Sequence, residues 1–476
     1  MGLIEDRSQR KFKKMNDCTI IIIGITGDLA RRKLIPALYK LIALGKLDKF
    51  LIIGAAKEDT RIDQILDGAK HFIHPVDEAV WNLLRSSIHY IRVDAVQEHD
   101  FFALHEFVSR LEHSCNMAGN RLLYCSTAAD LFCPITENAV KTGLIKRGSG
   151  QLWNRVVYEK PFGYDLRSAH AINSCICRLL EDEQIYRIDH YLTEQIVSSI
   201  ALVRFTNSVF EPLWNNRYIS QVQIILNEKL CVGNRGGYYD KYGALKDMLQ
   251  NHMLELLALI GMEAPKELTG EQIRAERSKV LKQVHVVDAL IAQYNGYQQE
   301  PYVRPNSPTE TFAAAHLMID NPRWAGVPFF LKTGKCLDKK DTAIHIQFKH
   351  VDCLLTQKCP SEPNYLTIQV TPNPSFFLTL NVKKPGFVQE VMPVRMEFCH
   401  NCIFKEGTVE SYEVIFDEVI RGEHSVSVRF DEIEHAWKII DTINDMKLPL
   451  YYYERASHGP NEMEQFEFKH GMRWRA

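Results

Sequence analysis

Residues 19–29 read TIIIIGITGDL, a run of β-branched residues that leads directly into a turn with two glycines, Gly24 and Gly27. β-Branched residues favour strands, and the leucines that follow recur at helical spacing as far as residue 44. A glycine turn between a strand and a helix lets the backbone approach a pyrophosphate at the positive end of the helix dipole. The stretch therefore predicts that the chain begins with a Rossmann-like, dinucleotide-binding fold.

The glycine spacing is G-x-x-G instead of the G-x-G-x-x-G of many dinucleotide sites. A plain strand–helix turn without a ligand is therefore the alternative. If the turn binds a cofactor, the residues that we expect around its phosphates are Gly24, Thr26, Gly27, Asp28 and Leu29.

A cation follows the second predicted strand, where an NAD site usually has an acid for the ribose hydroxyls. Lys57 stands at this place. A lysine favours the 2′-phosphate of NADP, although it lacks the fork geometry of arginine. The neighbouring Glu58 and Asp59 weaken the preference. We expect NADP as the cofactor, with NAD as the alternative.

Residues 1–188 alternate strand and helix patterns. After the first strand, strand-like runs occur at 51–55, 89–93, 121–125 and 156–158, with helical stretches between them. Such alternation predicts a parallel, doubly wound sheet. We expect a dinucleotide-binding domain over residues 1–188.

Residues 189–476 have a different pattern. Strand-like runs occupy 201–205, 221–226, 343–348, 366–370, 376–382 and 391–398, and several alternate polar and apolar residues. Long helical patterns interrupt them at 243–259 and 431–443. We expect an α+β domain with a large, mostly antiparallel sheet over residues 189–476.

The composition is that of a soluble globular protein able to bury a large core. The 476 residues are 46% hydrophobic and 24% charged, with a net charge of −2, which gives no electrostatic case for binding nucleic acid or an anionic membrane. The sequence contains no apolar run long enough to span a bilayer, and its polar N-terminus is no secretory signal. We expect a cytoplasmic enzyme.

Twelve cysteines without a signal sequence predict reduced thiols. One pair, Cys399 and Cys402, has the spacing of zinc ligands, but a second C-x-x-C pair is missing. We therefore expect no metal and interpret the pair as two thiols at the end of a strand.

Two polar motifs carry the candidate chemistry. Residues 187–192 read RIDHYL, which combines acid, imidazole and phenol in one short stretch. Asp247 and His252 lie five residues apart in a predicted helix. With the glycine turn, these motifs resemble the glucose-6-phosphate dehydrogenase family. The resemblance runs nearly from end to end and includes EKPFG at 159–163, FEPLWN at 210–215, KTGK at 332–335 and SHGP at 457–460.

The resemblance implies that the C1 hydroxyl of a sugar phosphate is oxidised to a lactone, with hydride transfer to a nicotinamide. His252 would be the general base, because imidazole titrates near neutral pH. Asp189 would accept a hydrogen bond from the other ring nitrogen, which fixes the tautomer and stabilises the imidazolium. On its own, a histidine in a helix is more often structural, but the matching acids Asp247 and Asp189 favour the catalytic role.

The resemblance also implies the substrate contacts. Glu228 and Asp247 would hold sugar hydroxyls, and Lys160, with Lys33 close by, would bridge substrate and cofactor. The side chains implied around the substrate phosphate are His190, Tyr191, Lys335 and Lys340, although the two lysines alone would be read as solvated surface residues. Members of the family form homodimers through the large sheet, so we expect a homodimer.

One position reverses the charge expected from the family. Where the family continues Gly-Lys-Glu, this chain has Thr193, Glu194 and Gln195. Two unit charges about 4 Å apart interact by roughly 4 kcal/mol at an effective dielectric constant of about 20, so Glu194 would weaken phosphate binding. A second departure is Thr371, where the family often has a glutamine.

Three interpretations follow from this departure. The chain is a working enzyme for the sugar phosphate, a dehydrogenase for a related sugar without the C6 phosphate, or a binding or partner protein without turnover. The retained catalytic set weighs against the third interpretation, because a chain released from catalysis has no physical need for it.

Overall fold

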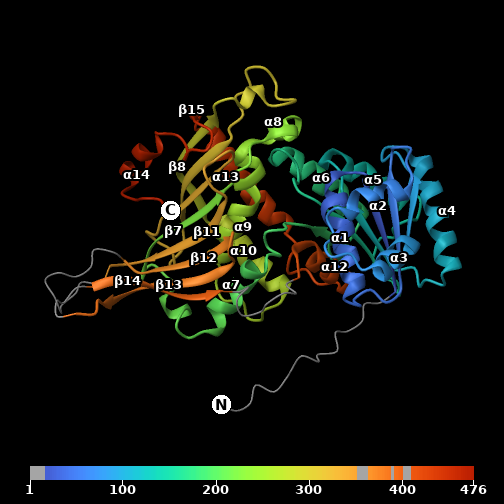
Figure 1. Cartoon of the computed structure of the whole chain (residues 1–476), viewed down its shortest axis with the longest axis horizontal. Helices are drawn as coiled ribbons and strands as arrows, with labels where there is room; N and C mark the ends of the chain where they lie inside the picture. Colours follow the sequence, from blue (N-terminus) through green and yellow to red (C-terminus); the bar gives the residue numbers. More distant parts are fainter. Residues whose placement is uncertain (1–16, 149, 351–362, 387–390, 400–408, 476) are drawn as a thin grey trace, which may run out of the picture. The chain divides into compact units, whose positions relative to one another are not determined.

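The computed structural model describes residues 17–148, 150–350, 363–386, 391–399 and 409–475 (Figure 1). Two compact units make up the fold. Unit 1 comprises Met1–Phe162, Ala171–His190 and Glu410–Ser427, and unit 2 comprises Gly163–His170, Tyr191–Val409 and Val428–Ala476. The domain limit predicted after residue 188 lies close to the break after His190. The sequence patterns do not indicate that residues 163–170 belong to unit 2, or that residues 410–427 belong to unit 1.

Unit 1 contains a six-stranded parallel sheet in the order β3-β2-β1-β4-β5-β6. The strands are β1 (Cys18–Ile23), β2 (Phe50–Ala56), β3 (Ile88–Arg92), β4 (Arg121–Cys125), β5 (Asn154–Tyr158) and β6 (Ile185–Arg187). This confirms the predicted Rossmann-like class. The strand order reverses between β1 and β4, and ligands of such sheets bind beyond the carboxyl ends of the strands at this point.

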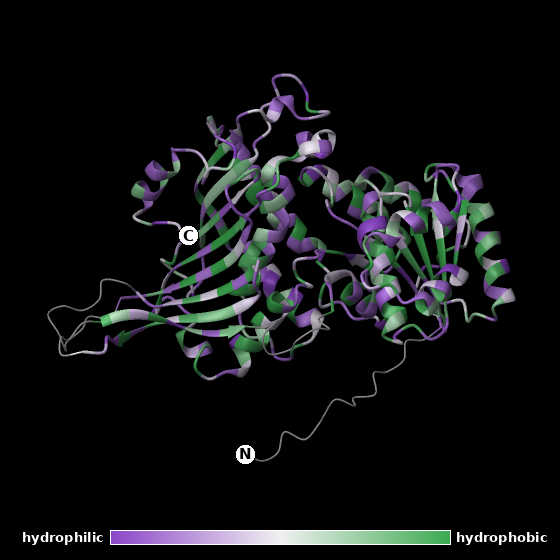
Figure 2. Ribbon diagram, in the orientation of Figure 1, coloured by the Kyte–Doolittle hydropathy of each residue, from purple (hydrophilic) through white to green (hydrophobic). Residues whose placement is uncertain are grey.

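Helices cover the sheet of unit 1. They are η1 (Ala30–Leu34), α1 (Ile35–Ala43), α2 (Ile62–Lys70), α3 (Glu78–Ser87), α4 (Glu98–Ser114), η2 (Ala129–Leu131), α5 (Phe132–Lys141), α6 (Leu166–Leu179, which crosses the unit limit at residue 171), η3 (Asp182–Gln184) and α12 (Ser411–Arg421). Ile20 and Ile22 of β1 belong to one buried cluster with α1 and with Phe416 of α12. Figure 2 shows the strands as largely hydrophobic, as expected for a sheet that is buried on both faces.

Unit 2 contains a nine-stranded sheet in the order β14-β13-β12-β11-β7-β10-β9-β8-β15. The strands are β7 (Ile219–Asn227), β8 (Val284–Tyr294), β9 (Phe312–Ile319), β10 (Phe329–Gly334), β11 (Asp341–Phe348), β12 (Tyr365–Thr371), β13 (Ser375–Lys383), β14 (Val391–Cys399) and β15 (Leu450–Tyr453). Two neighbouring pairs, β7 with β10 and β8 with β15, are parallel, and the other pairs are antiparallel. The predicted large, mostly antiparallel sheet is therefore confirmed.

The helices of unit 2 are α7 (Gln195–Thr206), η4 (Glu211–Leu213), η5 (Gly233–Arg235), α8 (Gly236–Ala244), η6 (Leu245–Met253), α9 (Leu254–Gly261), α10 (Gly270–Lys282), η7 (Tyr297–Gln299), α13 (Phe430–Asp445) and α14 (Met463–His470). Of the helices in the described residues, none is long and apolar enough to cross a membrane.

Two predictions about these segments need correction. Residues 201–205, predicted as a strand, lie in α7, which buries Ile196, Val197, Ile200, Ala201 and Arg204 at helical spacing. A five-residue, mostly apolar window cannot distinguish the two states. The helix predicted from residue 243 begins at Leu245, because Gly243 has φ +66° and a Cβ atom there would lie 2.3 Å from the Glu310 carboxylate.

The expectation of reduced cysteines is also wrong, as two disulfides that lie wholly within the described residues show. Cys133 is bonded to Cys175 in unit 1, and Cys231 to Cys336 in unit 2. These partners are 42 and 105 residues apart in the sequence, so no spacing motif could indicate them. The pair Cys399 and Cys402 extends beyond the described residues, since position 402 is not among them.

Candidate active site

The glycine turn lies at the carboxyl end of β1, beside β4. Gly24 has φ +88°, and a Cβ atom there would lie 2.4 Å from the carbonyl oxygen of Ser126, which directly follows β4. The Gly27 amide donates to the Gly24 carbonyl at 3.0 Å and closes the turn. Both the positive φ and the lack of room for a Cβ atom require a glycine at position 24. The turn passes close to the end of β4, where a pyrophosphate would bind.

The other residues predicted around the turn lie at the start of η1. Leu29 precedes this helix, and Asp28 accepts hydrogen bonds from Arg31 and Arg32. The Thr26 hydroxyl donates to the Glu58 carboxylate at 2.9 Å, and Lys33 Nζ lies 3.8 Å from the carboxylate of Glu410. The helix start therefore combines a close backbone turn with nearby lysine and arginine side chains, an arrangement that fits a dinucleotide phosphate.

Arg92 is a cation beside Lys57 that the sequence analysis missed. It ends β3 opposite Ala56 of β2, and its Nε donates to the Lys57 carbonyl at 3.0 Å. Both side chains are exposed. Two cationic residues at neighbouring strand ends suit a phosphate ester better than the single lysine does. Only strand pairing brings the two residues together.

A buried acid, Glu159, lies in unit 1 next to two predicted site residues. The Tyr124 hydroxyl donates to Glu159 at 2.5 Å, and Tyr412 also hydrogen bonds to this carboxyl group. Burial raises the pKa of Glu159 to about 7, the Tyr124 hydrogen bond and the positive charge of Lys160 oppose the rise, and the negative charge of Asp189 adds to it. Burial therefore favours the protonated form of this acid, in contrast to an exposed glutamate.

Tyr412 also contacts the predicted phosphate ligand His190. Their rings lie 6.5 Å apart between centroids, with an interplanar angle of 17°. Tyr412 is on α12, more than 200 residues further along the chain. Sequence analysis missed both Tyr412 and Glu159. Glu159 could have been noticed, because it begins the EKPFG stretch at 159–163.

In unit 2, His252 lies on the π-helix η6 and contacts Tyr191. Their ring centroids are 4.2 Å apart at an interplanar angle of 36°, and the His252 side chain is 1% exposed. A π-helix makes i→i+5 hydrogen bonds. Asp247 and His252, five residues apart, therefore lie almost above one another, whereas an α-helix would turn them to different faces.

Glu228, Asp247 and Lys335 form one charge cluster in unit 2. Lys335 Nζ makes a salt bridge with the Glu228 carboxylate and lies 3.8 Å from Asp247 Oδ2. The Tyr238 hydroxyl donates to Asp247 Oδ1 at 3.4 Å. Glu228 and Lys335 directly follow β7 and β10, which are parallel neighbours and so end at the same edge of the sheet. Three of the predicted substrate residues are thus brought together.

The remaining substrate residues lie elsewhere. Lys160 follows β5, next to Glu159, and Asp189 is a buried residue near the C-terminal end of the 171–190 segment of unit 1. Lys340 is exposed in the turn before β11 and forms no salt bridge within the described part of the chain. Glu194 is the N-cap residue of α7. A negative charge at a helix N-terminus is stabilised by the helix dipole, which gives Glu194 a local structural role.

A parallel dinucleotide-binding sheet, followed by a separate unit with a buried histidine and paired acids, defines a two-domain, nicotinamide-dependent dehydrogenase. Two family profiles match the chain: "Glucose-6-phosphate dehydrogenase, NAD binding domain" over residues 21–199 and "Glucose-6-phosphate dehydrogenase, C-terminal domain" over residues 201–475. The chain belongs to the glucose-6-phosphate dehydrogenase family.

Individual relatives match over almost the whole chain. The glucose-6-phosphate 1-dehydrogenase of Bacillus subtilis (strain 168) is 35% identical over 488 residues, which cover 98% of this chain and 99% of the relative. That of Chlamydia muridarum is 35% identical over 490 residues, covering 96% and 97%.

Solved structures agree with this assignment. A glucose-6-phosphate dehydrogenase in complex with its substrate glucose-6-phosphate has a TM-score of 0.89 at 28% identity and covers 98% of this chain and 100% of its own. The glucose-6-phosphate 1-dehydrogenase from Mycobacterium avium has a TM-score of 0.83 at 32% identity, covering 97% and 99%.

The raised pKa of Glu159 predicts a pH-dependent stability difference. Between the ordinary pKa of 4.5 and about 7, the folded state holds a proton on Glu159 that the unfolded state has lost. Stability therefore falls as the pH rises through this window. Glu159→Gln removes this pH-dependent loss of stability. The free energy of unfolding of the variant minus that of the wild type should therefore increase by about 3 kcal/mol between about pH 4.5 and about pH 8. Denaturant unfolding at several pH values measures the change.

The exposed Glu106 offers a matched control for this measurement. Glu106→Gln removes the same charge from unit 1 without relieving burial, so its stability relative to wild type should stay nearly constant with pH. If Glu159→Gln shows the same flat profile, Glu159 does not hold a proton in the folded protein.

Proposed function

We propose that the chain is an NADP-dependent glucose-6-phosphate 1-dehydrogenase, which oxidises the C1 hydroxyl to a lactone at the entry of the pentose phosphate pathway. The main support is the buried His252, which lies beside Tyr191 and on the same helix as Asp247. Relatives that are glucose-6-phosphate 1-dehydrogenases match almost the whole chain. A buried imidazole next to an aromatic ring and acids is suited to take a proton from a sugar hydroxyl.

In the proposed mechanism, His252 removes the proton from the C1 hydroxyl. Asp189 receives a hydrogen bond from the other ring nitrogen, so the unprotonated nitrogen is directed at the substrate and the imidazolium is stabilised. Asp189 lies in unit 1 and His252 in unit 2, so their pairing is itself part of the proposal. Bound NADP supplies the acceptor for the hydride from C1.

The same proposal assigns the binding contacts. Glu228 and Asp247 accept hydrogen bonds from sugar hydroxyls. Lys335 has its charge balanced by both acids, so it orients these groups as well as attracting phosphate. The residues proposed to meet the substrate phosphate are His190, Tyr191, Lys335 and Lys340, and those proposed for the cofactor are Gly24, Thr26, Gly27, Asp28, Leu29, Lys33, Lys57 and Lys160.

Changing the catalytic pair tests the mechanism. We expect His252→Asn and Asp189→Asn each to lower kcat by about 10²- to 10⁴-fold, because each removes or misdirects the base. Steady-state NADPH formation from glucose 6-phosphate measures kcat. Cofactor affinity, measured by fluorescence titration, should be unchanged because the glycine turn is intact. Near-normal turnover of His252→Asn would rule out its role as the base.

A second candidate function follows from Glu194. Its carboxylate begins α7, and the buried Lys335 is already paired with the acids Glu228 and Asp247. A sugar with a neutral or amino group at C6 would then bind better than a phosphate ester. A third candidate, a chain that binds cofactor or a partner without turnover, has less support because the catalytic set is retained.

Glu194→Lys distinguishes these candidates. If glucose 6-phosphate is the substrate, the variant should lower its KM by about 10-fold or more, because a repulsion is replaced by an attraction. NADPH formation with glucose 6-phosphate, glucose and 6-amino-glucose measures the preference. Wild-type activity only with the sugars that lack phosphate favours the second candidate. No turnover by either protein, with cofactor still bound, favours the third.

The preference for NADP over NAD is supported by Lys57 and Arg92, which lie side by side at the ends of β2 and β3. Glu58 is hydrogen bonded to Thr26 and could hold a ribose hydroxyl, which keeps NAD as the alternative. We expect Lys57→Ala with Arg92→Ala to raise the KM for NADP by about 10- to 100-fold. The KM for NAD, measured in parallel, is the internal control, and an equal rise for both cofactors would contradict the assignment.

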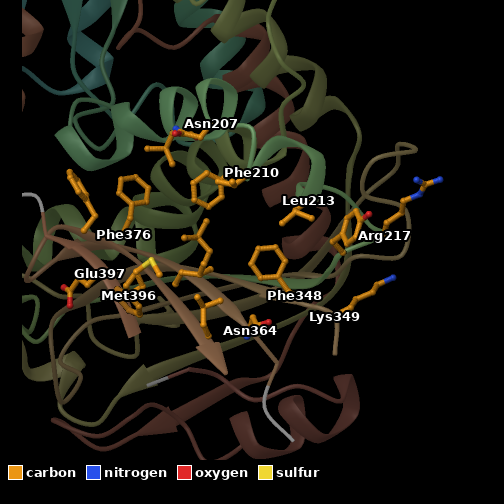
Figure 3. A pocket seen from close by; sticks show the side chains of 18 of the residues that line it. Asn207, Phe210, Leu213, Arg217, Phe348, Lys349, Asn364, Phe376, Met396 and Glu397 are labelled. Carbon is orange, nitrogen blue, oxygen red and sulfur yellow. The ribbon is translucent and has the colours of Figure 1, made fainter. Parts of the chain in front are cut away.

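We also propose a cytoplasmic homodimer that uses the outer strands of the sheet. Phe376 pairs with Phe398, and Leu378 with Met396, so one face of β13 and β14 is apolar, and Met396 is 65% exposed. A groove of about 1110 Å³ lies along this face, and Phe210 is among the side chains on its other wall (Figure 3). An apolar surface of this kind is typical of a protein interface.

Sedimentation velocity tests the dimer. Met396→Asp places a charge on the apolar face and should weaken association by about 100-fold or more. The control, Thr379→Asp, changes a residue of β13 on the opposite face and should leave the dimer intact. A dimer that persists in Met396→Asp would exclude this face as the contact.

A further inference from the structure

The two segments that carry Glu228 and Lys335 are joined by a disulfide. Cys231 lies three residues after Glu228, and Cys336 directly follows Lys335. The Cα atoms of the two cysteines are 4.2 Å apart. The crosslink therefore lies within a few residues of the salt bridge between Glu228 and Lys335, in the cluster proposed to bind the sugar.

The segment that carries Lys335 is held firmly by the sheet. The Lys335 amide donates to the Thr311 carbonyl at 2.9 Å, and its carbonyl accepts from the Tyr453 hydroxyl at 2.7 Å. Cys336 has φ +58°, a conformation that non-glycine residues seldom adopt, and its carbonyl accepts from the Ala456 amide. These contacts do not depend on the disulfide.

The segment from Glu228 to Cys231 is held less firmly. Lys229 and Leu230 are exposed, Leu230 to 80%. Its backbone bonds run to the Lys335 segment: the Cys336 amide donates to the Leu230 carbonyl at 3.0 Å, the Glu228 amide to the Gly334 carbonyl at 2.9 Å, and the Leu337 amide to the Glu228 carbonyl at 3.0 Å. Beyond these bonds, the disulfide is the covalent constraint that keeps Glu228 against Lys335. Its removal would increase the freedom of the Glu228 segment more than that of Lys335.

The sulfur atoms differ in access. Cys336 is 3% exposed, whereas Cys231 is partly exposed and follows the exposed Leu230. Thiol–disulfide exchange requires a thiolate to reach one sulfur, and Cys231 is the sulfur that it can reach. In a cytoplasm, where thiols are kept reduced, such a bond would open and close with the redox state.

We propose that Cys231 and Cys336 form a redox modification site that adjusts sugar binding by holding or releasing the Glu228 segment. This rests on the proposed function, because it assumes that Glu228 contacts the substrate. A dithiol opens the site: its thiolate bonds to Cys231 Sγ, the bond between the two cysteines breaks, and Cys336 leaves as a thiolate that takes up a proton. The second thiol of the reductant then displaces Cys231 and forms the cyclic disulfide. Two electrons and two protons pass to the protein, and a small disulfide such as glutathione disulfide reverses the step.

Kinetics of the oxidised and reduced enzyme test the proposal. After equilibration with dithiothreitol or glutathione disulfide, and with the bonding state established by differential alkylation and mass spectrometry, we expect the reduced form to have a KM for glucose 6-phosphate about 5- to 10-fold higher. The KM for NADP should not change, because the cofactor residues are in the other unit. Cys231→Ser should behave like the reduced form in both conditions.

The second disulfide supplies a matched control. Cys133→Ser removes the bond to Cys175 in unit 1, so this variant should keep the full redox response of the KM. Equal KM values in wild-type protein whose Cys231–Cys336 bond is shown to open and close would overturn the proposal. So would mass spectra in which this bond never forms under glutathione disulfide.

Limited proteolysis makes the test independent of activity. Lys229 is an exposed trypsin site inside the segment. We expect cleavage after Lys229 to be about 10-fold faster in the reduced wild type than in the oxidised one, since the freed segment opens more often, and to be redox-independent in Cys231→Ser. This response should occur even if glucose 6-phosphate is not the substrate. Cleavage at equal rates in both redox states would overturn the release of the segment itself.

Discussion

The alignment of parallel neighbouring strands determines where the functional side chains lie. Parallel strands end at the same edge of a sheet, so the residues that follow them meet there. In unit 1, the glycine turn after β1 meets Ser126 after β4 so closely that Gly24 has no room for a side chain. In unit 2, Glu228 after β7 meets Lys335 after β10, although they are 107 residues apart in the sequence. The same geometric rule thus builds the glycine turn of unit 1 and the charge cluster of unit 2, in sheets of different class.

Charge balance is the second constraint on the site. Lys335 is buried and has two acids as neighbours, so its charge is largely offset before any substrate binds. Glu159 is buried and hydrogen bonded by tyrosines, and burial keeps its proton near neutral pH. With Glu194 at the start of α7, the described candidates of unit 2 carry more acidic than basic charge.

Patterns that repeat over a whole element made the fold predictable. Short local patterns failed to predict the structure where long-range contacts determine it. The alternation of strands and helices over the first part of the chain, and the alternating runs at 366–370 and 376–382, correspond to observed strands because each pattern repeats over its whole element. Residues 201–205 were misassigned because so short and mostly apolar a stretch fits both periods. The π-helix η6 was not predictable, yet it gives Asp247 and His252 their common face.

Glycine spacing and strand–helix alternation are properties of neighbouring residues, so the sequence by itself determined the two-part fold and the glycine turn. The candidate acids and base were indicated by the resemblance of its motifs to the family. Only tertiary structure decided that Arg92 joins Lys57, that Tyr412 joins Glu159 and His190, and that Cys231 bonds to Cys336. The reason is physical. These contacts arise from strand register and from the return of α12 to unit 1, and neither is encoded in the spacing of the residues concerned.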